Sequence, residues 1–346
     1  MTTFTLPKPY LLFLGDVTDP RYAKTAFGLK DWAPADCVGE WVLNGSKLTT
    51  GLPRMTPSEA VARGAASVVI GVAPAGGQLE ERWIAPMIEA LEAGLDIVSG
   101  MHSSLEDTYQ IAQTASALGR RLINVRQPDP LTVVGTGRKR QGQRILTVGT
   151  DCALGKKYTA LALTKELRMR GISCDFRATG QTGVMIAGSG VPLDAVVADF
   201  ISGYAEALSP SAPADHWDVI EGQGSLFHPA FAGVTLGLLH GSQPDVMVLC
   251  HEPGRDRLLG LESFPTPALN VAIEAYLNAA RLTNRAARFA GISLNTAKLD
   301  DVAARVALKA ATKETGLPAA DPVRGFGLDA LVDACLQPVA ALAAHE

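Results

Sequence analysis

Residues 144–171, RILTVGTDCALGKKYTALALTKELRMRG, constrain the fold of this chain more than any other segment. An apolar run leads into Gly149, five residues separate it from Gly155, and Lys156 and Lys157 follow at the start of a helical pattern. Such a glycine-bracketed turn lets backbone N–H groups converge on a phosphate at the positive end of a helix, and a lysine there adds a full charge. The segment therefore predicts a strand, a phosphate-binding loop and a helix.

The loop departs from the standard pattern directly after its lysine. The standard loop has Ser or Thr there, and the hydroxyl binds Mg²⁺ beside the nucleotide phosphates. In this chain Lys157 takes that position and Tyr158 follows it. Thr159 lies about 200° further around the helix, so it is a poor substitute. We therefore expect the loop to hold a pyrophosphate without cleaving it, and we expect no metal to be required.

Short apolar runs alternate with helical patterns along the whole chain. In residues 1–130 the apolar runs are PYLLFLGDV, ASVVIGVAP, LDIVSG and RLINVRQP, with helical patterns at TPSEAVARGA and at 81–94. From residue 144 the runs are RILTVGT, SCDFRAT, WDVIEGQG, DVMVLCHE and FAGISLNT, with helical patterns at 156–170, 192–208, 267–283, 299–315 and 328–344. Strands separated by helices are typical of a parallel sheet. Proline, glycine and basic residues gather between the halves, so we expect domains at 1–130 and 144–346 and a linker at 131–143.

The composition argues against several classes of protein. Hydrophobic residues make up 47% and charged residues 19% of the 346 residues, as in ordinary globular enzymes. The net charge of −4 argues against a partner that is a nucleic acid or an acidic membrane. The five cysteines are far apart and form no CxxC pair, so we expect reduced core residues and neither disulfides nor a zinc site. The N-terminus lacks a signal-peptide pattern and no apolar run is long enough to span a membrane, so we expect a cytoplasmic protein.

Two later segments belong with the phosphate loop. WDVIEGQGSLFHP, residues 217–229, is an apolar strand that ends in Glu221 and a Gly-x-Gly turn. Phosphate-loop folds place a carboxylate at this position, where it holds a metal, orients water or acts as a base. FAGISLNTAKLD, residues 289–300, ends a strand in Asn295, whose amide can pair with the edge of an adenine.

These segments carry two resemblances. The C-terminal half resembles dethiobiotin synthetase in the spacing of its loop, in the Glu-Gly-x-Gly segment and in the Asn that follows a strand. Nearly the whole chain resembles a bacterial family once catalogued only as a domain of unknown function and now associated with D-glutamate N-acetyltransferase activity. The matching segments are GTDCALGKKYTALAL (149–163), ATGQTGVMI (178–186), DAVVADFISGYAE (194–206), VIEGQGSLFHPAFAGVTLGLLHGSQPD (219–245) and GMHSSL (100–105).

The resemblance implies acetyl transfer from acetyl-CoA to the amine of D-glutamate. It implies an N-terminal Rossmann-like α/β domain followed by a P-loop NTPase-like, doubly wound parallel-sheet domain. Coenzyme A contains an adenine and a pyrophosphate but needs no phosphoryl cleavage, which agrees with the missing Mg²⁺ hydroxyl. We expect a small-molecule substrate, no nucleic-acid or membrane partner, and a homo-oligomer.

The chemistry of acetyl transfer sets the expected site residues. A base must deprotonate the ammonium of the substrate, and N–H donors must stabilise the oxyanion. Our candidates for catalysis are Glu221, His228 and His240, with His251 less favoured. For acetyl-CoA we expect the loop residues Gly149, Thr150, Asp151, Cys152, Ala153, Leu154, Gly155, Lys156, Lys157 and Tyr158, together with Asn295. For the two carboxylates of D-glutamate we expect Arg177, Thr179, Gln181, Thr182 and Arg255.

Two other functions fit parts of the sequence. An ATP-dependent ligase or kinase acting on a small carboxylate agrees with Glu221 but not with Lys157. A non-catalytic nucleotide-binding module, in which the N-terminal domain signals to a partner, is the other alternative, because a fold alone does not fix function.

Overall fold

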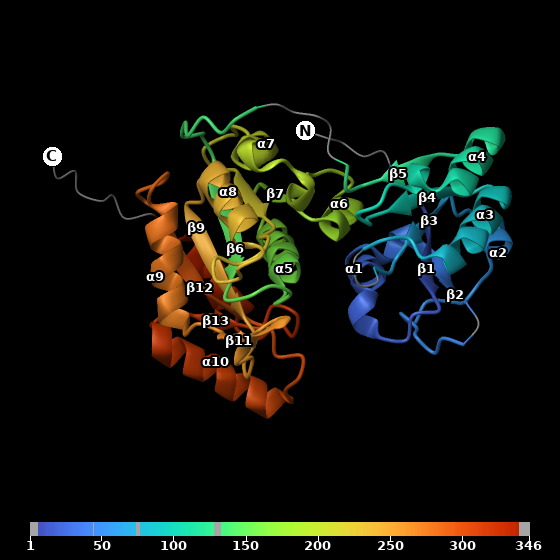
Figure 1. The fold of residues 1–346 in the computed structure, drawn as a ribbon. Helices are drawn as coiled ribbons and strands as arrows, with labels where there is room; N and C mark the ends of the chain where they lie inside the picture. Colours follow the sequence, from blue (N-terminus) through green and yellow to red (C-terminus); the bar gives the residue numbers. More distant parts are fainter. Residues whose placement is uncertain (1–5, 44, 74–76, 128–132, 339–346) are drawn as a thin grey trace. The chain divides into compact units, whose positions relative to one another are not determined.

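A computed structural model describes residues 6–43, 45–73, 77–127 and 133–338. The chain divides into two compact units, each built on a parallel sheet (Figure 1). The first unit groups Thr2–Asp129 with Gly180–Ala195, and the second groups Pro130–Thr179 with Val196–Glu346. An α/β fold with two parallel sheets was predicted from the sequence, and the structure confirms it.

The first unit holds a five-stranded sheet in the order β2-β1-β3-β4-β5, with every pair parallel. Its strands are β1 (Tyr10–Gly15), β2 (Cys37–Val42), β3 (Ser67–Ile70), β4 (Asp96–Ser99) and β5 (Leu122–Asn124). All six residues of β1, YLLFLG, are buried. A continuous apolar run of this kind is expected where helices cover both faces of a sheet.

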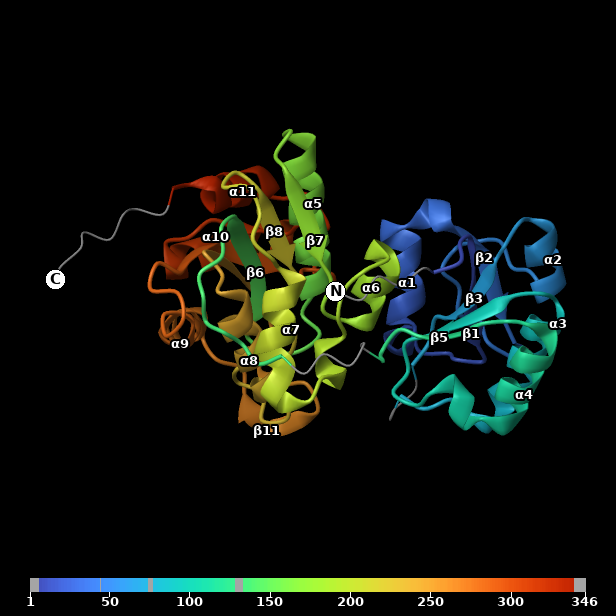
Figure 2. The same cartoon turned by 90° about the horizontal axis from the view of Figure 1, so that it is seen from above.

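Helices α1 (Lys24–Trp32), α2 (Pro57–Ala62), α3 (Ile84–Glu92) and α4 (Tyr109–Leu118) connect these strands. Figure 2 shows α1 on one face of the sheet and α2 and α3 on the other. Thr56 and Glu59 form a capping box at the start of α2, which satisfies backbone N–H groups that the helix leaves unpaired. In α3 the residues Met87 and Leu91 are buried, as the apolar periodicity of 81–94 predicts.

A segment from the second half of the sequence completes the first unit. Helix α6 (Gln181–Ala187) packs against α1, and the hydroxyls of Thr182 and Thr25 are hydrogen-bonded at 2.9 Å. Further along, Asp194 pairs with Arg126 at 2.9 Å. The boundaries expected from the sequence, 1–130 and 144–346, do not include this return of the chain.

The expected linker, 131–143, is attached to the second unit over much of its described part. Residues 131 and 132 lie outside the described residues. The N–H groups of Thr136 and Gly137 donate to Glu206, and Arg140 donates to the carbonyl oxygen of Gly241 at 2.8 Å. The segment is mostly exposed but makes specific contacts.

The second unit holds a six-stranded parallel sheet in the order β13-β12-β9-β6-β8-β7. Its strands are β6 (Gln143–Gly149), β7 (Cys174–Arg177), β8 (Trp217–Ile220), β9 (Val246–His251), β12 (Arg288–Leu294) and β13 (Ala319–Ala320). Strand β6 lies between β8 and β9, so the carboxyl ends of these three strands are neighbours. In open parallel sheets ligands bind at this edge.

Helices cover both faces of the second sheet. They are α5 (Lys156–Met169), α7 (Ile201–Leu208), α8 (Ala232–Ser242), α9 (Leu269–Ala280), α10 (Asp301–Thr315) and α11 (Leu328–Leu336). Figure 2 shows α5 and α11 on one face and α7, α8 and α9 on the other. Leu163 and Leu167 of α5 and Leu331 of α11 pack with the sheet residues Ile145 and Val219 in one buried core. A short antiparallel hairpin, β10 (Arg257–Leu258) and β11 (Leu261–Pro265), follows β9.

Two helices differ from the expectation. The helix expected at 192–208 begins only at Ile201, after two short 3₁₀ turns. Helix α8 was not predicted because its sequence, AGVTLGLLHGS, is rich in glycine, a poor helix former. Its glycines allow close packing against α7: a Cβ on Gly241 would lie 2.2 Å from the backbone oxygen of Ser202. Strand β2 and helices α1, α4 and α6 were also not predicted.

No helix within the described residues is long and apolar enough to cross a membrane. None of the five cysteines, which all lie in the described ranges, is part of a disulfide bond. Cys174, Cys250 and Cys335 are buried, as predicted, whereas Cys37 and Cys152 are partly exposed.

Arg144, at the start of β6, ties the linker to the second unit. Its side chain is almost fully buried, and its nitrogens donate to the carbonyl oxygens of Arg140, Gly142 and Gln141. It also donates to the hydroxyl of Ser209 at 2.8 Å. A planar guanidinium has five N–H donors, so it can bind these several oxygen acceptors at once. A shorter or neutral side chain would leave the acceptors without a donor.

We predict that Arg144→Met lowers the free energy of unfolding by about 3–5 kcal/mol, because buried acceptors lose their donor. Urea unfolding of the full chain measures this. Arg138→Met, at an exposed linker position, is the matched control and should change the value by less than about 0.5 kcal/mol. Equal effects of the two substitutions would contradict the role given to Arg144.

Candidate functional site

The predicted phosphate loop lies between the central strand β6 and helix α5. Strand β6 ends at Gly149 and α5 begins at Lys156, with Gly155 as its N-cap at a φ of 102°. Ala153 also has a positive φ, 52°. The first N–H groups of α5 have no partner within the helix, so they face this loop as donors for an anion.

The Lys156 side chain is turned into the loop. It is 7% exposed, and its Nζ donates to the backbone oxygen of Asp151 at 2.9 Å. Burial lowers the pKa of this ammonium below its ordinary value. A buried ammonium that donates to a backbone oxygen is well placed to bind an anion, because an anion offsets the cost of removing the charge from water.

Hydrogen bonds from outside the loop hold its first residue. The Tyr276 hydroxyl, from α9, donates to the Gly149 oxygen at 2.8 Å and accepts from the N–H of Leu226 at 3.2 Å. The Ser225 hydroxyl donates to the same oxygen at 2.9 Å. Burial raises the pKa of Tyr276 to about 12, so the phenol stays a donor. The sequence analysis missed both residues, since a tyrosine on an apolar helix face and a serine in a turn carry no distinctive signal.

Asp151 links the loop to the hairpin after β9. Its Oδ1 accepts from the N–H of Cys152 at 2.6 Å, and its Oδ2 accepts from Arg255 at 2.9 Å and from the N–H of Leu259 at 2.8 Å. Arg255 also donates to the Cys152 carbonyl oxygen at 2.8 Å and pairs with Glu252. The structure therefore brings the predicted Arg255 to the loop, with its guanidinium already bound to two carboxylates.

Glu221, the predicted acid, follows β8 and is 4% exposed. Its Oε2 accepts from the N–H of Thr179 at 3.0 Å, and the Thr179 hydroxyl donates to the backbone oxygen of Glu221 at 2.6 Å. Gln223 donates to the Thr179 hydroxyl at 3.1 Å. The next residue, Gly222, must be glycine, because a Cβ there would lie 1.7 Å from the backbone oxygen of Thr147 in β6. This close approach holds Glu221 beside the phosphate loop.

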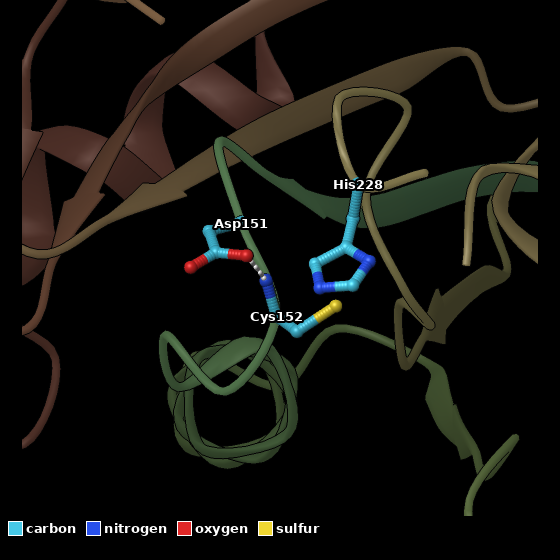
Figure 3. Close-up of side chains that lie close together, drawn as sticks. All are labelled: Asp151, Cys152 and His228. Atoms are coloured by element: carbon cyan, nitrogen blue, oxygen red, sulfur yellow. Dashed lines mark hydrogen bonds between the residues drawn. The ribbon is translucent and has the colours of Figure 1, made fainter. Parts of the chain in front are cut away.

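His228 lies next to the loop, as predicted. It is 4% exposed, and its ring lies 4.6 Å from that of Phe231. Its Nδ1 accepts from the N–H of Ala230 and its Nε2 lies 3.3 Å from the Leu259 oxygen. One side-chain atom each of His228, Asp151 and Cys152 lies within 4.8 Å of the other two. Figure 3 shows the Cys152 thiol beside the imidazole.

The other two histidines occupy different surroundings. His251, at the end of β9, is hydrogen-bonded through Nδ1 to the hydroxyl of Thr150 at 2.9 Å, and burial lowers its pKa. His240 lies in the last turn of α8 with its Nε2 3.1 Å from the oxygen of Ala279. A helix that crosses between parallel strands ends at the amino edge of the next strand. The structure therefore does not bring His240 together with Glu221 and His228.

Three predicted substrate residues are used in structural contacts. Arg177 pairs with Asp218 at 2.6 Å and with Asp175 at 3.1 Å, towards the amino ends of the strands. Thr182 is bonded to Thr25 within the first unit. Gln181 also belongs to that unit, where its side chain packs against Gly100.

The remaining predicted ligand residues lie around the loop and the end of β12. Lys157 stacks over the ring of Tyr158, with Nζ 5.2 Å from the ring centre. Thr159 faces the sheet, where its hydroxyl is bonded to that of Ser293 at 2.7 Å, so it does not replace the missing Mg²⁺ ligand. Asn295 follows β12, and its Oδ1 accepts from the N–H of Ala297 at 3.2 Å.

Comparisons with known proteins match both units. The family model for the DUF1611_N Rossmann-like domain matches residues 35–128, and that for the DUF1611_C P-loop domain matches residues 132–332. Both models are described as domains of unknown function. The Rossmann-like and P-loop expectations from the sequence are therefore confirmed.

Two relatives match nearly the whole chain. A protein of Tritonibacter scottomollicae is 48% identical over 94% of this chain and 98% of its own length. A protein of a Pseudoalteromonas species is 46% identical over 94% of this chain and 97% of its own length. Both relatives are named D-glutamate N-acetyltransferase.

A solved structure shares the fold of the chain. It is the crystal structure of a DUF1611 family protein from Anabaena variabilis, which is 35% identical with a TM-score of 0.86. The match covers 96% of this chain and all of the other. From both family models, both relatives and this structure, the chain is a member of the DUF1611 family.

Proposed function

We propose that this chain transfers the acetyl group of acetyl-CoA to the amino group of D-glutamate. The observation that carries the proposal is the identity of 48% and 46%, over 94% of the chain, to two proteins named D-glutamate N-acetyltransferase. At this identity and coverage the fold and the site residues are expected to correspond.

The phosphate loop fits a donor that is bound through a diphosphate and not cleaved there. The buried Lys156 ammonium and the first N–H groups of α5 supply positive charge and donors. Lys157 takes the place of the hydroxyl that holds Mg²⁺ in phosphoryl transfer. Acetyl-CoA supplies an activated thioester when bound, and the loop residues 149–158 would hold its diphosphate, with Asn295 near its adenine.

Glu221 is the proposed base. It is buried next to the loop, and the Thr179 N–H fixes the direction of its carboxylate. A carboxylate held in this way accepts the proton that the substrate ammonium must lose before its nitrogen attacks a carbonyl. His228 is the second candidate, since it also lies beside the loop. Arg255 and Thr179 are proposed to help orient the substrate carboxylates.

The first experiment incubates the full chain with acetyl-CoA and single amino acids and detects acetylated products by mass spectrometry. We expect N-acetyl-D-glutamate, and CoA released in equal amount, with much less product from L-glutamate. A product from another amino acid alone would replace the proposed substrate. ATP hydrolysis at an enzyme-like rate, with no acetylated product, would overturn the proposal.

We predict that Lys156→Ala weakens acetyl-CoA binding by about 1.5–3 kcal/mol, because a charged donor to the diphosphate is lost. Isothermal titration measures the affinity. Wild-type affinity should also fall as the pH rises through the pKa of Lys156, which burial has lowered, because the neutral amine no longer attracts the diphosphate. Lys165→Ala, at an exposed position of the same helix, is the control and should bind normally.

We predict that Glu221→Gln lowers turnover by about 10²–10⁴ with little change in acetyl-CoA affinity, because the amide keeps the shape but cannot accept the proton. Glu274→Gln, at an exposed position of α9, is the matched control. If Glu221→Gln keeps full turnover, His228 becomes the proposed base. A loss of melting temperature together with affinity would identify Glu221 as structural.

A further inference from the structure

We propose that Cys152 is a modification site: a reactive thiol that hydrogen peroxide and alkylating electrophiles modify, and whose modification blocks the phosphate loop. The inference rests on the proposed function only where it concerns acetyl-CoA as the ligand that is displaced. It begins from the cluster of Cys152, His228 and Asp151, in which only His228 had an expected catalytic role (Figure 3).

The backbone of Cys152 is held on both sides, and the residue is partly exposed. Its N–H donates to Asp151 Oδ1 at 2.6 Å, and its carbonyl oxygen accepts from Arg255 at 2.8 Å. The side chain therefore stays at one position on the loop. A nitrogen of the nearly buried His228 ring lies within 4.8 Å of the sulfur.

The charges around Cys152 favour the thiolate, which is the reactive form of a cysteine. The titratable groups near it are Asp151, Arg255, Lys156, His228 and the phenol of Tyr276. Asp151 is paired with Arg255, so these two charges largely cancel, and the Lys156 ammonium is left as the unmatched charge of the loop. The positive N-terminus of α5 follows three residues later and also favours a negative charge on the sulfur.

A metal ion explains the same cluster less well. Both carboxylate oxygens of Asp151 already accept hydrogen bonds, and one of them binds the Arg255 guanidinium. A divalent cation would have to displace these donors and lie close to Arg255 and Lys156. The positive surroundings that favour a thiolate therefore disfavour a bound cation.

The other four cysteines are expected to react slowly, so reagents should modify Cys152 selectively. Cys37 is also partly exposed, but burial raises its pKa to about 12. Burial also raises the pKa values of the remaining three, which are Cys174, Cys250 and Cys335. Cys37 is thus an internal control with similar exposure and a thiol that stays protonated.

The peroxide reaction balances without any further reactant. The Cys152 thiolate attacks one oxygen of hydrogen peroxide, an S–O bond forms, and the O–O bond breaks. Sulfur is oxidised to a sulfenic acid, and the hydroxide that leaves takes a proton to become water. Excess dithiothreitol reverses the change: one thiol gives a mixed disulfide and water, and a second thiol releases Cys152. The added oxygen, or a larger alkyl group, lies on the loop where an anion would bind.

The test labels the full-length protein with limiting iodoacetamide at neutral pH and maps the five cysteines by mass spectrometry. We expect Cys152 to react at least about a hundred-fold faster than Cys37, because very little of the Cys37 thiol is ionised. Acetyl-CoA or inorganic pyrophosphate should slow the labelling of Cys152 and leave that of Cys37 unchanged. Lys156→Met should slow labelling of Cys152 about ten-fold, because the positive charge that favours the thiolate is lost.

A binding measurement tests the second half of the proposal. Peroxide treatment should abolish pyrophosphate binding by the wild type, and dithiothreitol should restore it. Cys152→Ala and Cys152→Ser should each bind equally with and without peroxide. Similar labelling rates for Cys152 and Cys37, or peroxide-treated wild type that binds pyrophosphate normally, would overturn the proposal. So would one equivalent of zinc in the purified protein that protects Cys152 until a chelator removes it.

These outcomes are separate from the failure of the proposed function. The labelling rates and the pyrophosphate measurements need neither acetyl-CoA nor turnover. A protein that fails to acetylate D-glutamate but shows the fast, pyrophosphate-protected labelling of Cys152 would overturn the proposed function and support the thiol site.

Discussion

The second unit depends on a positive charge that is buried at the end of its central strand. Lys156 is 7% exposed, and its Nζ donates to the backbone oxygen of Asp151. Removing an ammonium from water is unfavourable unless an opposite charge compensates. The surrounding hydrogen bonds hold the loop in a shape that an anion can enter without rearranging it. Tyr276 and Ser225 donate to the Gly149 oxygen, and the N–H of Leu259 in the hairpin donates to Asp151. The buried charge makes the free loop less stable, and a bound anion gains affinity because it compensates that charge.

Ion pairs connect the loop to the segment that follows β9. Arg255 is shared between Asp151 and Glu252, and Lys298 also pairs with Glu252, at 2.5 Å. Asp151 and Glu252 thus each have a cationic partner other than Lys156. The same pairing explains why Arg255, although it lies at the loop as predicted, is less free to bind a substrate carboxylate than a sequence motif suggests.

Features that depend on local pattern were predicted from the sequence, and features that depend on tertiary contact were not. The strand, glycines and lysine of residues 144–171 have a fixed spacing, so the loop could be located exactly where β6 meets α5. Helix α8 was missed because its glycines are unfavourable in an isolated helix and become useful only against α7. Arg177 was assigned to substrate because it follows a strand, but its side chain runs back to Asp218, which only the folded register reveals. His240 illustrates the same limit, since a motif does not state at which edge of the sheet a helix ends.

Because residues 180–195 return to the first unit, one recombination event in the gene cannot separate the two units cleanly. A single genetic crossover near residue 130 would give one product without α6, leaving the face of α1 near Thr25 uncovered, and another with α6 but nothing for it to pack against. Neither half is a complete module, although each sheet is continuous in itself. Recombination that exchanges whole domains would therefore be selected against, and the two sheets are expected to diverge together as one gene.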